Sequence, residues 1–99
     1  MELRVLNYFL TVVYEENITS AAEKLHITQP TLSRQLMQLE EELGVSLFRR
    51  GKKKITLTSE GLLLKRRAEE ILDLTSRTEL ELKEQKTLMN GEIAIGGGE

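Results

Sequence analysis

The sequence predicts a mainly α-helical fold, a winged helix-turn-helix of three helices and a two-stranded β-hairpin, followed by one long helix. Three observations predict this fold. Helical segments at about 19–25 and 29–43 are joined by a tight three-residue connection. Apolar and polar residues then alternate around a basic, glycine-centred tip at 49–54. A heptad-like pattern finally runs through 59–89.

Composition limits the classes of protein that fit. The 99 residues, 39 % hydrophobic and 30 % charged, suffice for one small globular unit but not for a deep enzyme cleft with its own lid. The absence of cysteine excludes disulfides and thiolate metal sites. No apolar run reaches the length of a membrane span, and the N-terminus lacks a signal-peptide pattern. We therefore expect a cytoplasmic protein with no membrane partner.

The first two predicted helices are short and amphipathic. Residues 3–16 form the first helix, and Asn17 is expected to end it because Asn tolerates left-handed backbone. In the second helix Ser20 and Glu23 have the spacing of a capping box. The core-facing side chains of the first helix are Leu3, Leu6, Phe9, Leu10 and Val13.

The third helix has clear start and stop signals. Thr28 is the expected N-cap, Pro30 falls in the first turn, where its missing N–H has no intrahelical partner, and Gly44 ends the helix. One face carries a leucine stripe that must face a core: Leu32, Leu36, Leu39 and Leu43.

The opposite face of the third helix changes from polar to acidic along its length. Short hydrogen-bonding side chains surround Arg34 at the start, whereas residues 40–42 are all glutamates. A helix that enters the major groove of DNA by its N-terminus needs this gradient, with base-reading groups in front and acids away from phosphates. The candidate DNA-binding residues are Gln29, Pro30, Thr31, Ser33, Arg34 and Gln38. Alternatively, Arg34 forms a surface salt bridge with Glu41, and Pro30 and Thr31 serve only the helix cap.

The predicted hairpin tip is strongly basic although the net charge of the chain is −2. Such a run is often a plain solvated surface. Beside a groove-binding helix it also suits phosphates or the adjacent minor groove. The candidate contacts here are Arg49, Arg50, Lys52, Lys53 and Lys54.

The long helix begins with Thr58 as a cap and a favourable acid at Glu60, and Gly61 is its one weak point. Thirty residues make about 45 Å of helix, too long for the preceding unit to cover. We expect a homodimer through this helix, the alternative being packing along its own domain. The predicted dimerisation row is Leu64, Ala68, Ile71, Thr75, Thr78 and Leu82, continuing to Gln85 and Met89. After an Asn-Gly turn, residues 92–95 are expected to begin a strand.

No set of residues predicts catalysis, so we expect no enzyme activity and no cofactor. His26 is the only histidine and lies in a turn. The consecutive glutamates 40–42 point around a helix instead of converging. No cluster has metal-ligand spacing, and the glycines at 96–98 lack the lysine of a phosphate loop.

The pieces "SAAEKLHITQPTLSRQ", "LEEELGVSLF" and "LTSEG", in this order, resemble the LysR-type transcriptional regulators. The resemblance implies a winged helix-turn-helix DNA-binding domain at 1–58, a linker and dimerisation helix at 59–89, and at 90–99 the start of a truncated effector-binding domain. It also implies sequence-specific binding to double-stranded DNA with an inverted repeat, and bacterial transcription regulation by a small-molecule effector. A homodimer, and a tetramer for the full-length protein, would be the assembly.

By position, the resemblance carries the base-reading role to Gln29, Pro30, Thr31, Ser33 and Arg34, and wing contacts to Arg50 and Lys53. Two features depart from the family pattern: Glu60 replaces a common alanine, and a lysine run replaces the usual mix of arginine and threonine in the wing. Lysine is a point charge and lacks the bidentate geometry of arginine, so the run suggests more point-charge contact and less bidentate contact with phosphates.

Overall fold

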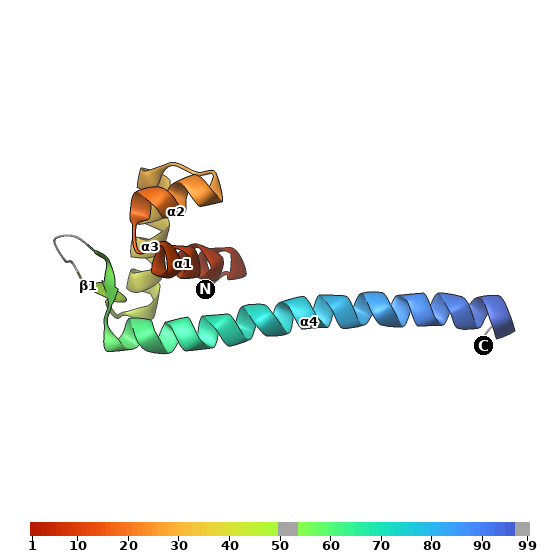
Figure 1. The fold of residues 1–99 in the computed structure, drawn as a ribbon. Helices are drawn as coiled ribbons and strands as arrows, with labels where there is room; N and C mark the ends of the chain where they lie inside the picture. The colour runs from red at the N-terminus through yellow and green to blue at the C-terminus, as the bar shows by residue number, and fades with distance from the viewer. Residues whose placement is uncertain (50–53, 97–99) are drawn as a thin grey trace.

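A compact three-helix unit carries a small hairpin at one side and a long helix that extends far beyond it (Figure 1). The computed structural model describes residues 1–49 and 54–96, with side chains to residue 86. Its principal extents are 64 × 26 × 20 Å. The elements, in chain order, are α1 (Leu3–Glu15), α2 (Ile18–Leu25), α3 (Gln29–Leu43), β1 (Phe48–Arg49), β2 (Thr56–Leu57) and α4 (Ser59–Gly96).

The core lies where α1, α2 and α3 meet the first turns of α4. Phe9 is fully buried at its centre, and its ring lies 5.4 Å from the ring of Phe48. Ala21 and Ala22 of α2 are also buried, and their small side chains let neighbouring backbones approach closely. The leucine stripe of α3 packs inward as predicted at Leu32, Leu36 and Leu39.

The two ends of that stripe differ in burial. Leu43, the last helical residue before the C-cap, is 38 % exposed, in contrast to the three buried leucines before it. The other core side chains include Val5, Leu6, Leu10, Val12, Leu47 and Ala68.

The turn between α1 and α2 differs from the expectation. Glu16, not Asn17, takes the left-handed conformation (φ 58°) that ends α1. Asn17 is extended (φ −157°) and its Oδ1 accepts a hydrogen bond from the Ser20 N–H at 2.8 Å, so it is the N-cap of α2. The predicted capping box at Ser20 and Glu23 is therefore wrong: Asn17 caps the helix one turn earlier, so Ser20 lies inside it.

The connection from α2 to α3 forms as predicted. His26 ends α2 in a left-handed conformation (φ 59°), so its role in this structure is that of a backbone turn residue. The Thr28 Oγ1 accepts from the Thr31 N–H, and Pro30 lies in the first turn of α3. Gly44 (φ 73°) then ends α3. The helix-turn-helix is confirmed.

The hairpin is short and antiparallel, with Phe48 paired to Leu57 and Arg49 to Thr56. Two side chains that the sequence did not single out for this role anchor its base. Glu40 Oε2 accepts from the Leu47 N–H at 2.7 Å, and the Thr58 hydroxyl donates to the Ser46 carbonyl at 2.6 Å. The first bond ties the hairpin to the C-terminal half of α3, and the second joins the two ends of the hairpin.

The long helix α4 starts as predicted but ends later. The Thr58 Oγ1 accepts from the Gly61 N–H at 3.0 Å, which confirms the cap, and bonding to its own backbone and to Ser59 lowers the pKa of the Glu60 carboxyl. The helix continues to Gly96, so the turn and strand expected at 90–95 are not seen. A lone strand has no partner for its backbone groups, whereas a helix satisfies them locally.

A polar contact joins α1 to α4 beside their apolar packing. The Tyr14 hydroxyl donates to Glu69 Oε2, and Lys65 Nζ lies 3.1 Å from the same carboxylate and 5.8 Å from the centre of the Tyr14 ring. The hydrogen bond to Glu69 raises the pKa of Tyr14 to about 12. That bond, with the one from Lys65, lowers the pKa of Glu69.

Candidate functional site

The start of α3 presents the polar side chains that the sequence predicts. Gln29, Pro30 and Arg34 are exposed and Ser33 is half-buried. The ion pairs among the described residues do not include Arg34, so the alternative of a salt bridge with Glu41 is not realised. The Arg34 guanidinium is therefore available to a ligand in front of the helix.

Two of these side chains have partners within the protein. Gln29 Oε1 accepts from the Thr19 hydroxyl at 3.4 Å, which leaves the amide nitrogen of Gln29 to donate outward. Thr31 is bound to Thr28 through both its N–H and its hydroxyl oxygen. The main role of Thr31 is thus to complete the N-terminal cap of α3. Thr19 was not predicted, because its contact joins different helices and leaves no local sequence signal.

A groove runs between α3 and the hairpin. Its lining includes apolar side chains from Leu36, Phe48 and Ile55 and the hydroxyl-bearing residues Ser33 and Ser46. The remaining lining residues are Ile18, Met37, Glu40 and Arg49. The groove therefore joins the polar start of α3 to a cationic side chain of β1.

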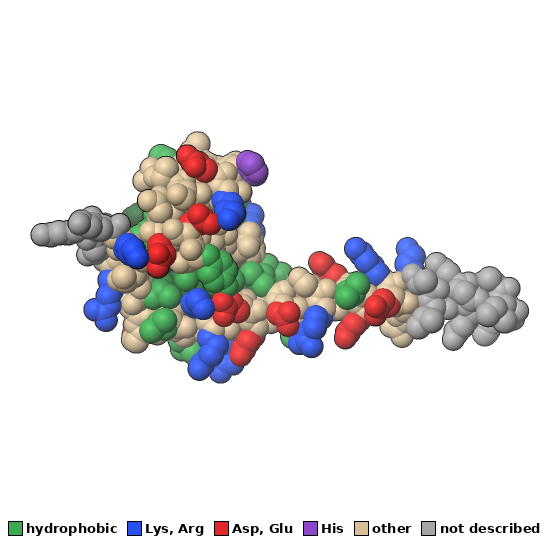
Figure 2. Space-filling view, in the orientation of Figure 1, with side chains coloured by type: hydrophobic (Ala, Val, Ile, Leu, Met, Phe, Trp, Pro, Cys, Tyr) green, Lys and Arg blue, Asp and Glu red, His purple; other side chains and the backbone are tan. Residues whose placement is uncertain are grey.

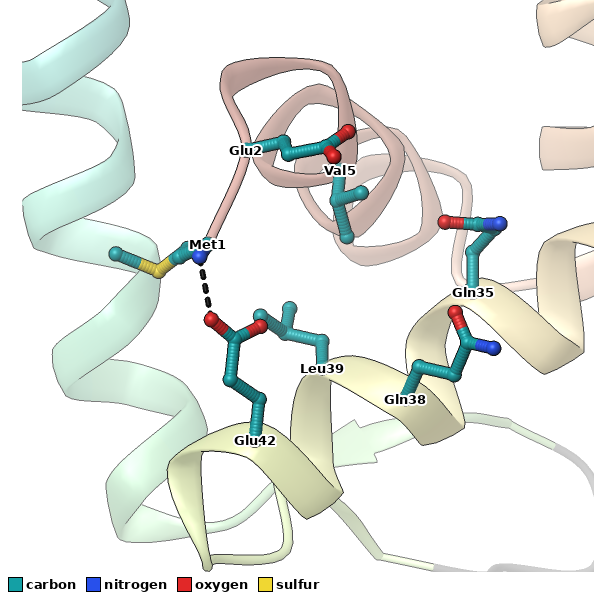
Figure 3. Close-up of a pocket in the computed structure, with 7 residues that line it drawn as sticks. All are labelled: Met1, Glu2, Val5, Gln35, Gln38, Leu39 and Glu42. Carbon is teal, nitrogen blue, oxygen red and sulfur yellow. Dashed lines mark hydrogen bonds and ion pairs between the residues drawn. The ribbon is translucent and has the colours of Figure 1, made fainter.

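A second hollow lies on the other flank of α3, toward the start of α1. Figure 3 shows Gln35, Gln38 and Glu42 of α3 around it, with Glu42 bonded to the amino group of Met1 at 2.5 Å. Gln38 is exposed but lies on this flank, away from the groove that Ser33 lines. Gln38 is thus separate from Ser33, although the sequence predicted both as DNA-binding candidates.

The basic tip is only partly within the described residues. Arg49 is exposed on β1, and Lys54 is exposed with Glu16 Oε1 3.7 Å from its Nζ. At this distance and exposure the pair is weak, and the Lys54 charge remains available to an anion. Arg50, Lys52 and Lys53 lie outside the described residues.

The predicted dimerisation row splits into two parts. Ala68 is fully buried and Leu64 and Ile71 pack on the core, so Ala68 serves the domain and not a dimer contact, contrary to the prediction. The reason is that α1 packs along the first turns of α4. Figure 2 shows hydrophobic side chains gathered where the two meet, with charged ones further along α4.

The far part of the row remains open to a partner. Thr78 and Leu82 are exposed and Thr75 is half-buried. The hydroxyls of Thr75 and Thr78 donate to the carbonyls of Ile71 and Leu74. Because these hydroxyls are satisfied within the helix, the threonines present their methyl groups outward. Exposed leucines on the same helix include Leu62, Leu63, Leu74, Leu80 and Leu82.

The described residues offer no metal-binding or membrane-spanning feature. Within 1–49 and 54–96 no three acidic or histidine side chains are grouped so as to hold a metal ion. No helix in this part of the chain is long and apolar enough to cross a membrane. The outward face of α3 and the groove beside it form the candidate site, because they bring exposed hydrogen-bonding and cationic side chains together.

Three helices and a two-stranded hairpin in this order define a winged helix-turn-helix domain. The model of the bacterial regulatory helix-turn-helix proteins of the lysR family matches residues 3–62. The chain belongs to this family, and its relatives are transcriptional regulators and not enzymes.

Two curated relatives illustrate the extent of the match. The HTH-type transcriptional regulator BsdA of Bacillus subtilis (strain 168) is 53 % identical over 97 residues, which covers 97 % of this chain and 33 % of the relative. BenM of Acinetobacter baylyi is 56 % identical over 61 residues, covering 62 % of this chain and 20 % of BenM. The chain thus spans about a third of the length of BsdA.

Solved structures with the same fold include complexes with DNA. The BenM DBD bound to catB site 1 DNA superposes with a TM-score of 0.84 at 43 % identity, covering 87 % of this chain and 97 % of that one. The CbnR DBD–DNA complex gives 0.82 at 37 % identity, covering 87 % and 99 %. The mainly helical fold with a long C-terminal helix is confirmed.

Proposed function

We propose that this chain is the sequence-specific, double-stranded DNA-binding part of a LysR-type transcriptional regulator. In this proposal α3 lies in the major groove by its N-terminal half, and the hairpin meets phosphates or the adjacent minor groove. The observation that carries the proposal is the outward face of α3. It exposes Arg34, which has no ion-pair partner among the described residues, beside a groove edged by Arg49, and it becomes acidic only at its far end.

Each side chain suits a distinct contact. The fork of Arg34 matches the O6 and N7 acceptors of guanine, and the outward amide of Gln29 matches the edge of adenine. The Ser33 hydroxyl can bond a base or a phosphate. Arg49 and Lys54 add positive charge for phosphates, and the partial positive charge at the start of α3 acts in the same direction.

We also propose that the protein binds as a homodimer through the far part of α4. The exposed Leu82, with Leu74 on its flank and the outward methyl groups of Thr75 and Thr78 on the same side of the helix, supports this assignment. A two-fold dimer places one α3 on each half-site, so the target is an inverted repeat.

For the whole protein, we propose control of transcription in the bacterial cytoplasm. A small-molecule effector, sensed outside the residues of this chain, would regulate it, and two dimers would form a tetramer. The support for this is membership of a family whose relatives are named transcriptional regulators, together with the share of their length that this chain spans.

The test is a titration of this chain with two duplexes, one selected from a random library and one with the same bases scrambled, at about 50 mM and 200 mM salt. We expect the selected duplex to bind more tightly at both concentrations. The slope of log K against log salt should become shallower by roughly 0.9 for each phosphate that a variant no longer neutralises. Arg49→Gln should therefore flatten the slope with little effect on sequence preference.

Arg34→Ala is the matched variant, because Arg34 is exposed and its removal should leave the fold unchanged. It should lose roughly 1–3 kcal/mol of preference for the selected duplex per half-site. A winged-helix module whose basic hairpin binds an acidic protein would instead show neither sequence preference nor a steep salt slope. That result would refute the proposed function.

A further inference from the structure

The side chain of Met37 is an apolar group exposed on the recognition face of α3. It is 54 % exposed, whereas Leu32, Leu36 and Leu39 of the same helix are buried. Single exposed apolar residues are common on protein surfaces and prove nothing by themselves. The position of Met37 relative to the polar contacts is what gives it significance.

Met37 continues the stripe formed by Pro30, Ser33 and Arg34. These four residues have the spacing i, i+3, i+4, i+7, so they lie along one face of α3. The same spacing occurs among the four helix positions by which a homeodomain reads the major groove. The next residue on this face is Glu41, whose charge is unfavourable beside phosphates. Met37 is thus the last position of the stripe before it becomes acidic.

The surroundings of Met37 are apolar on one side and open on the other. It lines the groove with Phe48 and Ile55, while Ser33 and Arg49 provide polar groups at the same groove. An incoming methyl group would there exchange water for a thioether and its apolar neighbours. Methionine is unbranched and polarisable, so it adapts its shape to such a contact.

Only one base offers a methyl group in the major groove, and that base is thymine. Other side chains near the helix start are less suited to it. Thr31 is bound to Thr28 within the cap, and Pro30 lies two turns earlier than Met37.

We infer that Met37 is a specificity-determining residue that contacts the C5-methyl of a thymine in the target. The inference rests on the proposed function, and adds to it a base preference that hydrogen bonding by Arg34 or Gln29 does not supply. It also assigns the apolar contact to the middle of α3.

The test replaces each thymine of the selected duplex in turn with deoxyuridine, which removes only the methyl group. For the wild-type chain we expect one position in each half-site to lose about fourfold in affinity, the fold-change that corresponds to burial of one methyl group. Met37→Ala should bind the unmodified duplex more weakly and show no further loss at that position. Met37→Leu, which keeps an apolar side chain of similar volume, should keep the sensitivity.

Leu43→Ala is the matched control, because Leu43 is also apolar and partly exposed on α3 but lies behind the acidic end. It should keep the wild-type deoxyuridine profile, and circular dichroism should show that all variants are folded. If Met37→Ala keeps the full deoxyuridine sensitivity at every thymine, or if the wild type shows none, the inference is wrong while the proposed function stands. A wild-type chain that does not prefer the selected duplex over the scrambled one would overturn both.

Discussion

Replacement of Gly61 by alanine tests helix propensity against tertiary packing. Propensity predicts that the substitution raises the free energy of unfolding, and packing predicts that it lowers it. In an exposed helix Gly→Ala stabilises by up to about 1 kcal/mol. In this structure a Cβ on Gly61 would lie 2.1 Å from the Leu47 carbonyl oxygen and 2.9 Å from Leu57 Cδ2. Carbon and oxygen in close contact are normally about 3.3 Å apart, so the backbone must move by roughly 1 Å.

That movement is opposed by the contacts of Leu47. Its side chain is buried, and its carbonyl accepts from the Thr58 N–H at 3.0 Å. Overpacking of this kind costs typically about 1–3 kcal/mol and occasionally more. Because a 2.1 Å approach is severe, we take the upper end of this range, about 3 kcal/mol. After the propensity gain of about 1 kcal/mol is subtracted, we expect Gly61→Ala to lose about 2 kcal/mol of unfolding free energy, which lowers the melting temperature by roughly 8–16 °C. Thermal and urea unfolding, followed by circular dichroism at one protein concentration, measure this.

Gly44 provides the matched control. A Cβ there meets nothing within 4 Å, but the backbone is left-handed at φ 73°. Gly44→Ala should therefore lose about 1 kcal/mol through backbone strain alone, and Gly44→Asn less, because Asn tolerates this conformation. At Gly61 the order should be reversed, because the larger Asn side chain should lower the free energy of unfolding more than Ala does. An increase in stability for Gly61→Ala would refute the packing of α4 against the hairpin base.

Further predictions concern other contacts of the same framework. The pKa of Tyr14 is raised from 10.0 to about 12 by the bond to Glu69, so its contribution to stability is complete below pH 10 and is lost as the pH rises toward 12. Tyr14→Phe should remove this alkaline dependence, which urea unfolding across the range measures. The pKa of Glu69 is lowered below 4.5, so its contribution to stability is present above that pH and is lost on acidification. Glu69→Gln should therefore weaken the dependence of the unfolding free energy on pH in the acidic range. Thr28→Ala removes the cap of α3 and should cost about 1 kcal/mol in unfolding experiments. Leu82→Glu should weaken the proposed dimer in sedimentation equilibrium without lowering the helix content, and an unchanged association constant would contradict the assignment of this part of α4.

Helix ends that depend on neighbouring residues were predictable from the sequence. Thr28 and Gly44 bound α3, and Thr58 caps α4, because each interaction spans only a few residues. Asn17 shows the limit of this reasoning. Its type fits either end of a helix, and only the packing of α2 against α1 determines that it starts one, with Glu16 left to take the strained conformation.

Contacts between distant elements were not predictable. Glu40 was expected only as part of the acidic end of the third helix, yet its carboxylate accepts a hydrogen bond from the Leu47 backbone. Gly61 was expected as a weak point of the helix, yet the Leu47 carbonyl lies so close that only a residue without a side chain fits there. The position of Ala68 in the heptad row fitted packing against a partner helix and packing against α1 equally well, since a small residue suits either contact. The polar face of α3 was predictable because a helix fixes which residues share a face.

The central claim is that the outward face of α3 reads bases in the major groove. Methylation interference tests it most directly, because methylation of guanine N7 blocks an acceptor that lies only in that groove. With the selected inverted-repeat duplex, interference should occur at symmetric guanines in the two half-sites for the wild type. In Arg34→Ala at matched occupancy, interference at those guanines should disappear. The same interference pattern in both proteins would contradict the claim.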